Sequence, residues 1–175
     1  MLFRSNPTII RTIEDINKNF KKEIYYEVLG FLDNKYNSLP NNVYGHKILG
    51  GFEMINNFNK KIGIVNTVAS NCDAREEVSN YFSNMGFNFE NIIHPSVNIN
   101  HVKIGEGNIF YESSMVHPLV EIGSNNIISS MAGIAHDTKI LNNNFIGPNT
   151  YICGRDRKST RLNSSHRCIS YAVFC

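Results

Sequence analysis

The feature that most constrains the fold of this chain is a large apolar residue at every sixth position between residues 104 and 152. The series comprises Ile104, Phe110, Val116, Ile122, Ile128, Ile134, Ile140, Ile146 and Ile152. A second series of small or compact residues follows the first eight of these by four positions, at Asn108, Ser114, Val120, Asn126, Ala132, Thr138, Asn144 and Thr150. A six-residue period fits neither a helix nor the alternation of a strand. Two series in phase argue against a chance run of isoleucines and predict a solenoid that buries its core by stacking.

The period predicts a left-handed parallel β-helix whose triangular coils each contain three six-residue faces. About three coils fit between residues 91 and 154. The inner positions would stack along three lines, namely Ile104–Ile122–Ile140, Phe110–Ile128–Ile146 and Val116–Ile134–Ile152. Corners between faces need residues that tolerate left-handed backbone. We assign them to Gly105, Gly107, Gly123, Gly147 and the pairs Asn125–Asn126 and Asn142–Asn143.

Both ends of the chain read as foreign sequence. The stretch DRKSTRLNSSH with the following RCISYAVFC is the translation of a common sequencing-library adapter and its index, and MLFRS is the translation of the end of the other adapter. We therefore expect residues 1–5 and 155–175 to be adapter-derived and exclude them from fold reasoning. The alternative is a natural basic tail that binds nucleic acid or lipid.

Composition gives no sign of a polyanionic partner. The whole chain has 17 basic and 15 acidic residues, a net charge of +2. Without the six basic residues and one acidic residue of the end segments, 11 basic residues oppose 14 acidic ones, a net charge of −3. Nucleic acid is therefore not expected as a partner. No apolar run is long enough for a membrane span. The two remaining cysteines, Cys72 and Cys153, form no CxxC motif, which fits a cytoplasmic protein.

The part before the repeats, residues 6–90, alternates helix and strand. Periodicity predicts a helix from Thr8 to about Lys22, a strand over 24–31, a connection over 37–51, a short helix near 53–59, a strand over 62–68 and a helix over about 75–85. This alternation indicates an α/β domain whose first strand and Gly-rich turn are missing. Asp33, just after a strand, is a candidate ligand for a sugar or ribose hydroxyl. A carboxylate that opens a turn is equally often a local backbone acceptor.

The order of several segments resembles a known family. VLGFLDN, VYGHKILGGFEMI, Arg75 on a helix, NIIHPSV at 91–97, VHPLVEIG and IAHDTKI together resemble the bacterial sugar O/N-acyltransferases of the NeuD/PglD type. The resemblance covers essentially residues 6–154. It implies a partial Rossmann-like domain that binds a sugar nucleotide or sialic-acid-like substrate, followed by a β-helix that forms homotrimers. It also implies transfer of an acetyl group from acetyl-CoA to an amino or hydroxyl group, as in surface-glycan biosynthesis.

His136 is the candidate catalytic base. It follows inward-facing Ile134 by two residues, so we expect its imidazole to face outward at a corner, in the groove between neighbouring subunits. Acetyl transfer needs a base near neutral pH, for which histidine is the usual residue. By resemblance, IAHDTKI matches the segment that contains the family's catalytic histidine, and Asp137 would orient its ring. Ala135 and Leu141 depart from the family pattern, which leaves the orienting acid open. A corner histidine without a function is the alternative.

The other histidines carry weaker expectations. His94 and His117 resemble family positions, and His117 is a candidate substrate-binding residue, but both are equally plausible as structural turn residues. His46 and His101 are expected at the surface. Hexapeptide-repeat carbonic anhydrases bind zinc through a His-x4-His pair and a third ligand, a spacing absent here. No metal site is therefore expected.

The resemblance places acetyl-CoA along later coils, with Ile152 and Gly154 as candidate cofactor-binding residues and a backbone N–H near Gly154 as the oxyanion donor. Because those coils are largely absent, we expect the 175-residue polypeptide itself to be inactive and its last coil to end open with Ile152 exposed. Two other functions stay open. One is a hexapeptide-repeat acetyltransferase for serine or a xenobiotic, and the other is a non-catalytic trimerisation module.

Overall fold

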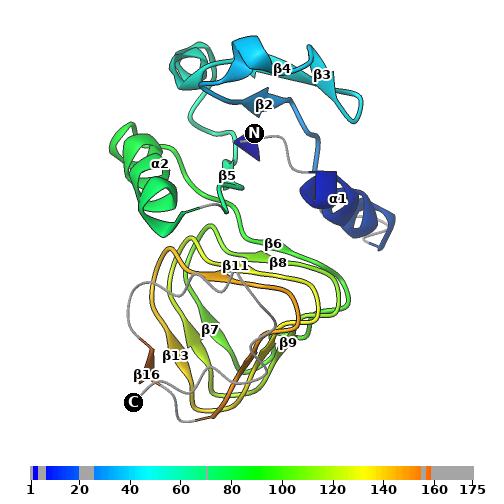
Figure 1. Ribbon diagram of the computed structural model, residues 1–175, viewed down its shortest axis with the longest axis vertical. Coiled ribbons are helices and arrows are strands. Elements are labelled where there is room, and N and C mark those ends of the chain that lie inside the picture. Colours follow the sequence, from blue (N-terminus) through cyan, green and yellow to red (C-terminus); the bar gives the residue numbers. More distant parts are fainter. Residues whose placement is uncertain (1, 4–6, 20–25, 70, 155–156, 159–175) are drawn as a thin grey trace.

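A computed structural model describes residues 2–3, 7–19, 26–69, 71–154 and 157–158 of the chain. It contains an α/β domain joined to a solenoid of stacked parallel strands (Figure 1). The predictions for residues 1, 4–6, 20–25, 155–156 and 159–175 fall outside the described residues.

The solenoid has three faces, each built from two-residue strands that pair in parallel with the coils before and after. The first face contains β6 (Ile92–Ile93), β8 (Ile109–Phe110), β11 (Ile127–Ile128) and β14 (Phe145–Ile146). The second contains β9 (Met115–Val116), β12 (Gly133–Ile134) and β15 (Tyr151–Ile152). The third contains β7 (Lys103–Ile104), β10 (Glu121–Ile122), β13 (Lys139–Ile140) and β16 (Arg157–Lys158). We call them the covered face, the apolar face and the charged face, for reasons given below.

The three predicted inner lines are confirmed by the strand register. Ile122 pairs with Ile104 and Ile140 on the charged face, and the other two faces follow the same rule. All members of the first series from Phe110 to Ile152 are buried, and so are all members of the second series. The stacked parallel strands fit the predicted left-handed β-helix.

Ile152 is not exposed, contrary to expectation. Its side chain is 1 % exposed and belongs to the interior cluster of the solenoid. The reason is its inward strand position, in register with Ile134 one coil earlier. The chain also continues into β16, which pairs with β13 at the start of a further coil.

The corners were predicted in part. The left-handed residues are every sixth one from His101 to Asn149, namely His101, Gly107, Ser113, Leu119, Asn125, Met131, Asp137, Asn143 and Asn149. The predictions for Gly107, Asn125 and Asn143 are confirmed, whereas Gly105, Gly123 and Gly147 are not among the left-handed residues. Gly105 and Gly123 serve close packing instead. A Cβ on Gly105 would lie 2.8 Å from the carbonyl oxygen of Gly123, and a Cβ on Gly123 would lie 2.9 Å from the carbonyl carbon of Leu141.

A ladder of buried asparagines runs along one corner. The Oδ1 of Asn108 accepts from the backbone N–H of Asn126 at 2.9 Å and from its side-chain Nδ2 at 3.0 Å. The Oδ1 of Asn126 accepts the same two bonds from Asn144, at 2.8 and 3.0 Å. The ladder therefore satisfies buried backbone donors directly before the strands begin.

The α/β domain begins with β1 (Leu2–Phe3) and α1 (Pro7–Asn19). After β2 (Phe31–Leu32), a 3-10 turn η1 (Tyr36–Ser38) leads to β3 (Asn42–Val43) and β4 (His46–Gly50), and η2 (Phe52–Asn57), β5 (Val65–Asn66) and α2 (Cys72–Asn84) complete it. The strands form one sheet in the order β3-β4-β2-β1-β5, in which β3 is antiparallel and the others are parallel.

A two-residue strand, β1, occupies the place in the sheet where the first strand was expected to be missing. Leu2–Phe3 lies between β2 and β5 and pairs in parallel with both. The central position of a parallel sheet has a hydrogen-bonding neighbour on each side, so a short segment suffices to form a strand there. The strand expected over 24–31 is limited to β2, because residues 26–30 have no paired neighbour among the described residues.

The connection over 37–51 contains a hairpin that the sequence analysis missed. β3 and β4 are joined by Tyr44 and Gly45, whose φ angles are 50° and 80°. Positive φ at both positions is characteristic of the type I′ hairpin turn, which accounts for the glycine.

Helix α1 lies in a hydrophobic cluster to which both domains contribute. Its buried residues Ile9, Ile10, Ile13 and Ile16 pack with Ile92, Ile109 and Ile127 of the covered face, and Phe145 packs against the same cluster. An ion pair between Arg11 and Glu112, at 2.7 Å, flanks this contact. The covered face is thus the side of the β-helix that the α/β domain occupies (Figure 1).

Arg75 of α2 forms a second link between the domains. Its side chain is buried, and its guanidinium donates to the backbone oxygens of Asn66 and Val68 and to that of Asn125 at a β-helix corner. Burial lowers the pKa of Arg75 to about 9, against the opposing effects of Tyr111 and Cys72. Backbone carbonyls thus solvate a cation that has no carboxylate beside it among the described residues.

Replacing Asn126 with alanine should destabilise the solenoid. The change leaves the buried backbone N–H of Asn144 without its acceptor, a loss of roughly 2–3 kcal/mol in the free energy of unfolding. Urea denaturation followed by circular dichroism measures it, with Asn100→Ala, an exposed asparagine of the same solenoid, as the control. Equal stability of the two variants would contradict the ladder's role.

Candidate active site

His136 lies at the corner between the apolar face and the charged face. It lies two residues after buried Ile134, the last residue of β12, and its side chain is 57 % exposed. The expectation that the imidazole faces outward is therefore met.

Asp137 contacts one nitrogen of the His136 ring. The Nδ1 atom of His136 lies 2.8 Å from the Oδ2 atom of Asp137. Asp137 has a φ of 57°, a conformation that aspartate tolerates better than most residues, and this turn brings its carboxylate back to the preceding side chain. An Nδ1–H that donates to the carboxylate leaves the lone pair on Nε2. The pair therefore has the geometry of a base with its orienting acid.

Gly154 lies one coil after His136, directly against its ring. A Cβ on Gly154 would be 3.0 Å from the carbonyl oxygen of His136, 3.3 Å from its Cε1 and 3.4 Å from its Nε2. Any side chain at this position would crowd the Nε2 atom of His136. Glycine thus keeps the space beside Nε2 open, which the sequence did not reveal.

The remaining predicted site residues are placed as follows. Ile152 has its side chain in the core, and its carbonyl accepts from the N–H of Ala135, so its side chain is not available to a cofactor. His117 is partly buried and donates its backbone N–H to Ile134 one coil later, in the column of Ala135 rather than that of His136.

Asp33 lies in the other domain, at the carboxyl end of β2. Its Oδ1 accepts from the backbone N–H of Lys35 at 2.8 Å, the local turn contact that was weighed as an alternative. The structure thus brings His136, Asp137 and Gly154 together and leaves Asp33 apart from them. Within the residues that the structure describes, no three histidine, cysteine, aspartate or glutamate side chains gather as metal ligands.

The outward residues give each face of the solenoid a different surface. On the charged face, Glu121 accepts from Lys103 at 2.9 Å and pairs with Lys139 at 3.3 Å. Hydrogen bonds from Lys103 and then Lys139 lower the pKa of Glu121.

The apolar face, beside His136, has a different composition. Its outward strand positions are Met115, Gly133 and Tyr151, of which Met115 is 49 % and Tyr151 38 % exposed. The ring of Tyr151 lies over Gly133, where a Cβ would be 2.4 Å from it. Leu119 and Met131, at the two edges of this face, are 67 % and 58 % exposed. A patch of this kind is typical of a surface that another subunit covers.

Comparisons with known proteins show the fold. The chain resembles the acetyltransferase domain of PglB from Neisseria gonorrhoeae in complex with acetyl coenzyme A, with a TM-score of 0.76 and 19 % identity over 92 % of this chain and 74 % of that one. It also resembles a mutant of perosamine N-acetyltransferase from Caulobacter crescentus in complex with CoA and GDP-perosamine (TM-score 0.73, 17 % identity, 87 % and 70 % of the two chains). A third similar structure is WeeI from Acinetobacter baumannii AYE (TM-score 0.70, 16 % identity, 86 % and 69 %).

No family model matches the sequence, and no curated protein matches it. At 16–19 % identity, the structural likeness shows a shared fold and no more. Among the described helices, none has the length and apolar character needed to cross a membrane.

Replacing Asp137 with glycine should release the ring of His136. Glycine accepts the left-handed backbone, so the variant removes the carboxylate without strain. We expect ¹⁵N NMR of His136 to lose the single Nδ1–H tautomer in Asp137→Gly. Asp137→Asn, which retains an acceptor oxygen at the same position, should keep it. A tautomer that is unchanged in the glycine variant would show that Asp137 does not orient the ring.

Proposed function

We propose that this chain is part of an acetyl-CoA-dependent acetyltransferase of the NeuD/PglD type. Its substrate would be an amino or hydroxyl group of a nucleotide-linked or sialic-type sugar. The observation that carries the proposal is the His136–Asp137 pair, with Gly154 beside Nε2, at an exposed corner of this β-helix. The PglB domain and the perosamine enzyme, whose structures contain acetyl coenzyme A or CoA, have the same fold.

In this proposal, His136 removes a proton from the acceptor group through Nε2. Asp137 keeps the other nitrogen protonated and stabilises the imidazolium that forms. Acetyl-CoA supplies the thioester carbonyl that the acceptor attacks. The backbone N–H of Gly154, which has no acceptor among the described residues, is the candidate donor to the developing oxyanion. His136 then returns its proton to the departing thiolate.

The α/β domain is the candidate site of the sugar nucleotide. The parallel part of its sheet has the order β4-β2-β1-β5, which is the order of the first strands in a Rossmann-like domain. Asp33 ends β2, the edge at which such domains bind ribose or sugar hydroxyls, and its Oδ2 has no partner among the described residues. The C. crescentus enzyme, crystallised with GDP-perosamine, supports a nucleotide-linked substrate.

The apolar face is the candidate trimer interface. The α/β domain occupies the covered face, and ion pairs cover the third, which leaves Met115, Tyr151 and their neighbours exposed beside His136. Burial of this patch against a second subunit would place the groove for acetyl-CoA next to Nε2.

The natural enzyme would contain more than this chain. We propose that residues 1–5 and 155–175 are adapter-derived, so the coils that complete the acetyl-CoA groove belong to the longer gene product. Activity is therefore to be measured on the complete polypeptide that contains residues 6–154.

Replacing His136 with alanine in that complete polypeptide should lower kcat about 10²- to 10⁴-fold with little change in KM, because the base is lost while binding contacts remain. Release of CoA thiol from acetyl-CoA, with amino-sugar nucleotides as acceptors, measures the rate. His101→Asn, at another exposed corner histidine, is the control. Undiminished acetyl transfer by the alanine variant would exclude His136 as the base. Another residue would then have to act as the base.

Replacing Met115 with aspartate should prevent trimer formation. A carboxylate at the centre of an apolar interface would be buried without a partner. This lowers the free energy of association by on the order of several kcal/mol per subunit contact. Light scattering coupled to size exclusion measures the mass. The matched control is Lys103→Asp, in the same coil on the charged face. Trimers that survive Met115→Asp would place the interface elsewhere.

A further inference from the structure

His94 lies at a corner of the solenoid away from His136. It follows β6 in the first coil, where the chain turns from the covered face toward the apolar face, whereas His136 lies between the apolar face and the charged face. The side chain of His94 is 11 % exposed. Each of its two ring nitrogens lies beside a side-chain oxygen, one from Ser96 and the other from Asp15.

Ser96 occupies the Nδ1 side of the His94 ring. Its Oγ atom lies 2.8 Å from Nδ1, and its backbone N–H donates to the same nitrogen at 3.1 Å. A ring nitrogen that accepts from an N–H carries a lone pair and no proton. The Oγ atom accepts the backbone N–H of Ser113 at 2.9 Å, so its own hydroxyl proton is directed at Nδ1. Ser96 is an exposed residue, which a small molecule in solution can reach.

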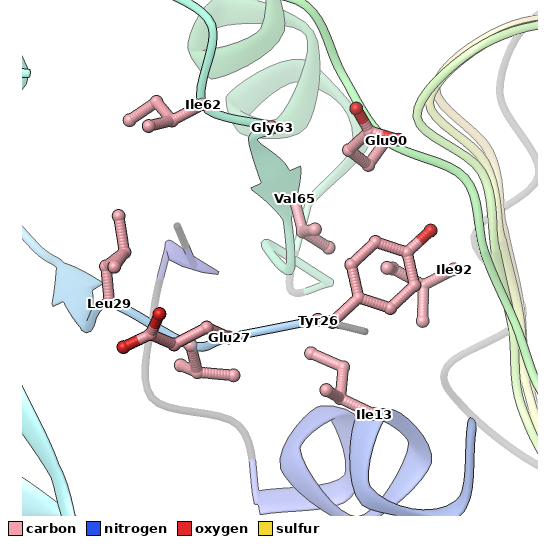
Figure 2. A pocket seen from close by; sticks show the side chains of 10 residues that line it. Ile13, Tyr26, Glu27, Leu29, Ile62, Gly63, Val65, Glu90 and Ile92 are labelled. Atoms are coloured by element: carbon pink, nitrogen blue, oxygen red, sulfur yellow. The ribbon is translucent and has the colours of Figure 1, made fainter. Parts of the chain in front are cut away.

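Asp15 occupies the Nε2 side of the same ring. Its Oδ2 atom lies 3.5 Å from Nε2, which carries the proton of a neutral ring whose lone pair is on Nδ1. The carboxylate comes from α1, in the other domain. Ile13 and Ile92, each two residues before one member of this pair, belong to one buried cluster and line one pocket (Figure 2). This packing holds α1, and with it Asp15, against the strand that leads into His94.

A local turn accounts for only part of this arrangement. A histidine that accepts the backbone N–H two residues later can serve to close a turn, and that role needs neither a hydroxyl nor a carboxylate. Here a hydroxyl, an imidazole and a carboxylate follow one another from Ser96 through His94 to Asp15. A nucleophile beside a base that a third group orients is the arrangement that activates serine for acyl transfer.

We propose that Ser96 is a second reactive site, a nucleophile that takes an acyl group from an activated ester, with His94 as its base and Asp15 as a positioning residue. The Oγ atom of Ser96 bonds to the carbonyl carbon of the ester, and the bond from that carbon to the leaving oxygen breaks. His94 takes the hydroxyl proton on Nδ1 and passes it to the departing oxygen. The site does not use His136, so the proposal stands apart from acetyl transfer to a sugar.

The test treats the 175-residue chain with p-nitrophenyl acetate and follows acetylation of each serine by peptide mass spectrometry. Ser113 is the internal control, because it is an exposed residue at the same corner one coil later and has no histidine bonded to its hydroxyl among the described residues. We expect Ser96 to be acetylated about 100-fold faster than Ser113, the smaller of the usual contributions of a general base. Equal rates at the two serines of the unaltered chain would overturn the proposal, whatever any variant does.

Three variants then assign the roles, each with its fold checked by circular dichroism. His94→Gln should slow acetylation of Ser96 to the rate of Ser113, and an unchanged rate would also overturn the proposal. Asp15→Asn should slow it by roughly 10-fold, less than in an enclosed triad because the contact is long and partly exposed. His136→Ala should leave the rate at Ser96 unchanged. The result at Ser96 and the result for acetyl transfer to sugars are therefore read separately.

Discussion

The structure depends on the exact stacking of one coil on the next. A single coil has three two-residue strands and no core of its own, so its inward side chains are buried through the coils on either side. Backbone ladders on all three faces, with the asparagine ladder at a corner, hold each coil in register with its neighbours. A slip of one residue would exchange inward and outward side chains on every face, and this makes the register strongly specified.

The corners of the solenoid have an unfavourable backbone conformation, which lowers stability according to the residue type at each corner. Left-handed backbone at a residue other than glycine costs on the order of 1–3 kcal/mol, least for asparagine and aspartate. Asn125, Asp137 and Asn143 fit that preference, but Leu119 and Met131 do not. Both of these residues border the apolar face and are largely exposed. Their side chains therefore do not pack in the core of this chain, and in the proposed trimer they would lie at the interface.

The sequence predicted the inside of the solenoid far better than its surface. Period alone identifies Ile122 or Ile146 as inward, because burial follows directly from the six-residue repeat. Gly105 and Gly123 were wrongly assigned to left-handed corners. In a sequence, a glycine that close packing requires cannot be told from one that a positive φ angle requires. The position of Gly154 beside His136 and the existence of the apolar face become visible only when the register between coils is known. Sorting the outward residues by face, with Met115 and Tyr151 on one and Lys103 and Glu121 on another, would have revealed that face. The hairpin at Tyr44–Gly45 lacked the usual Asn-Gly signal.

The candidate site follows from the same stacking. His136 and Asp137 are adjacent in sequence, but their geometry depends on two coils. The left-handed turn at Asp137 brings the carboxylate to Nδ1, and the coil that ends at Gly154 sets what lies beside Nε2. Thr138, directly after them, is buried and donates to the carbonyl of Cys153, so this corner is fastened to the following coil. The corner that holds His136, the proposed base, is thus fixed by the coil after it, through Gly154 and Thr138.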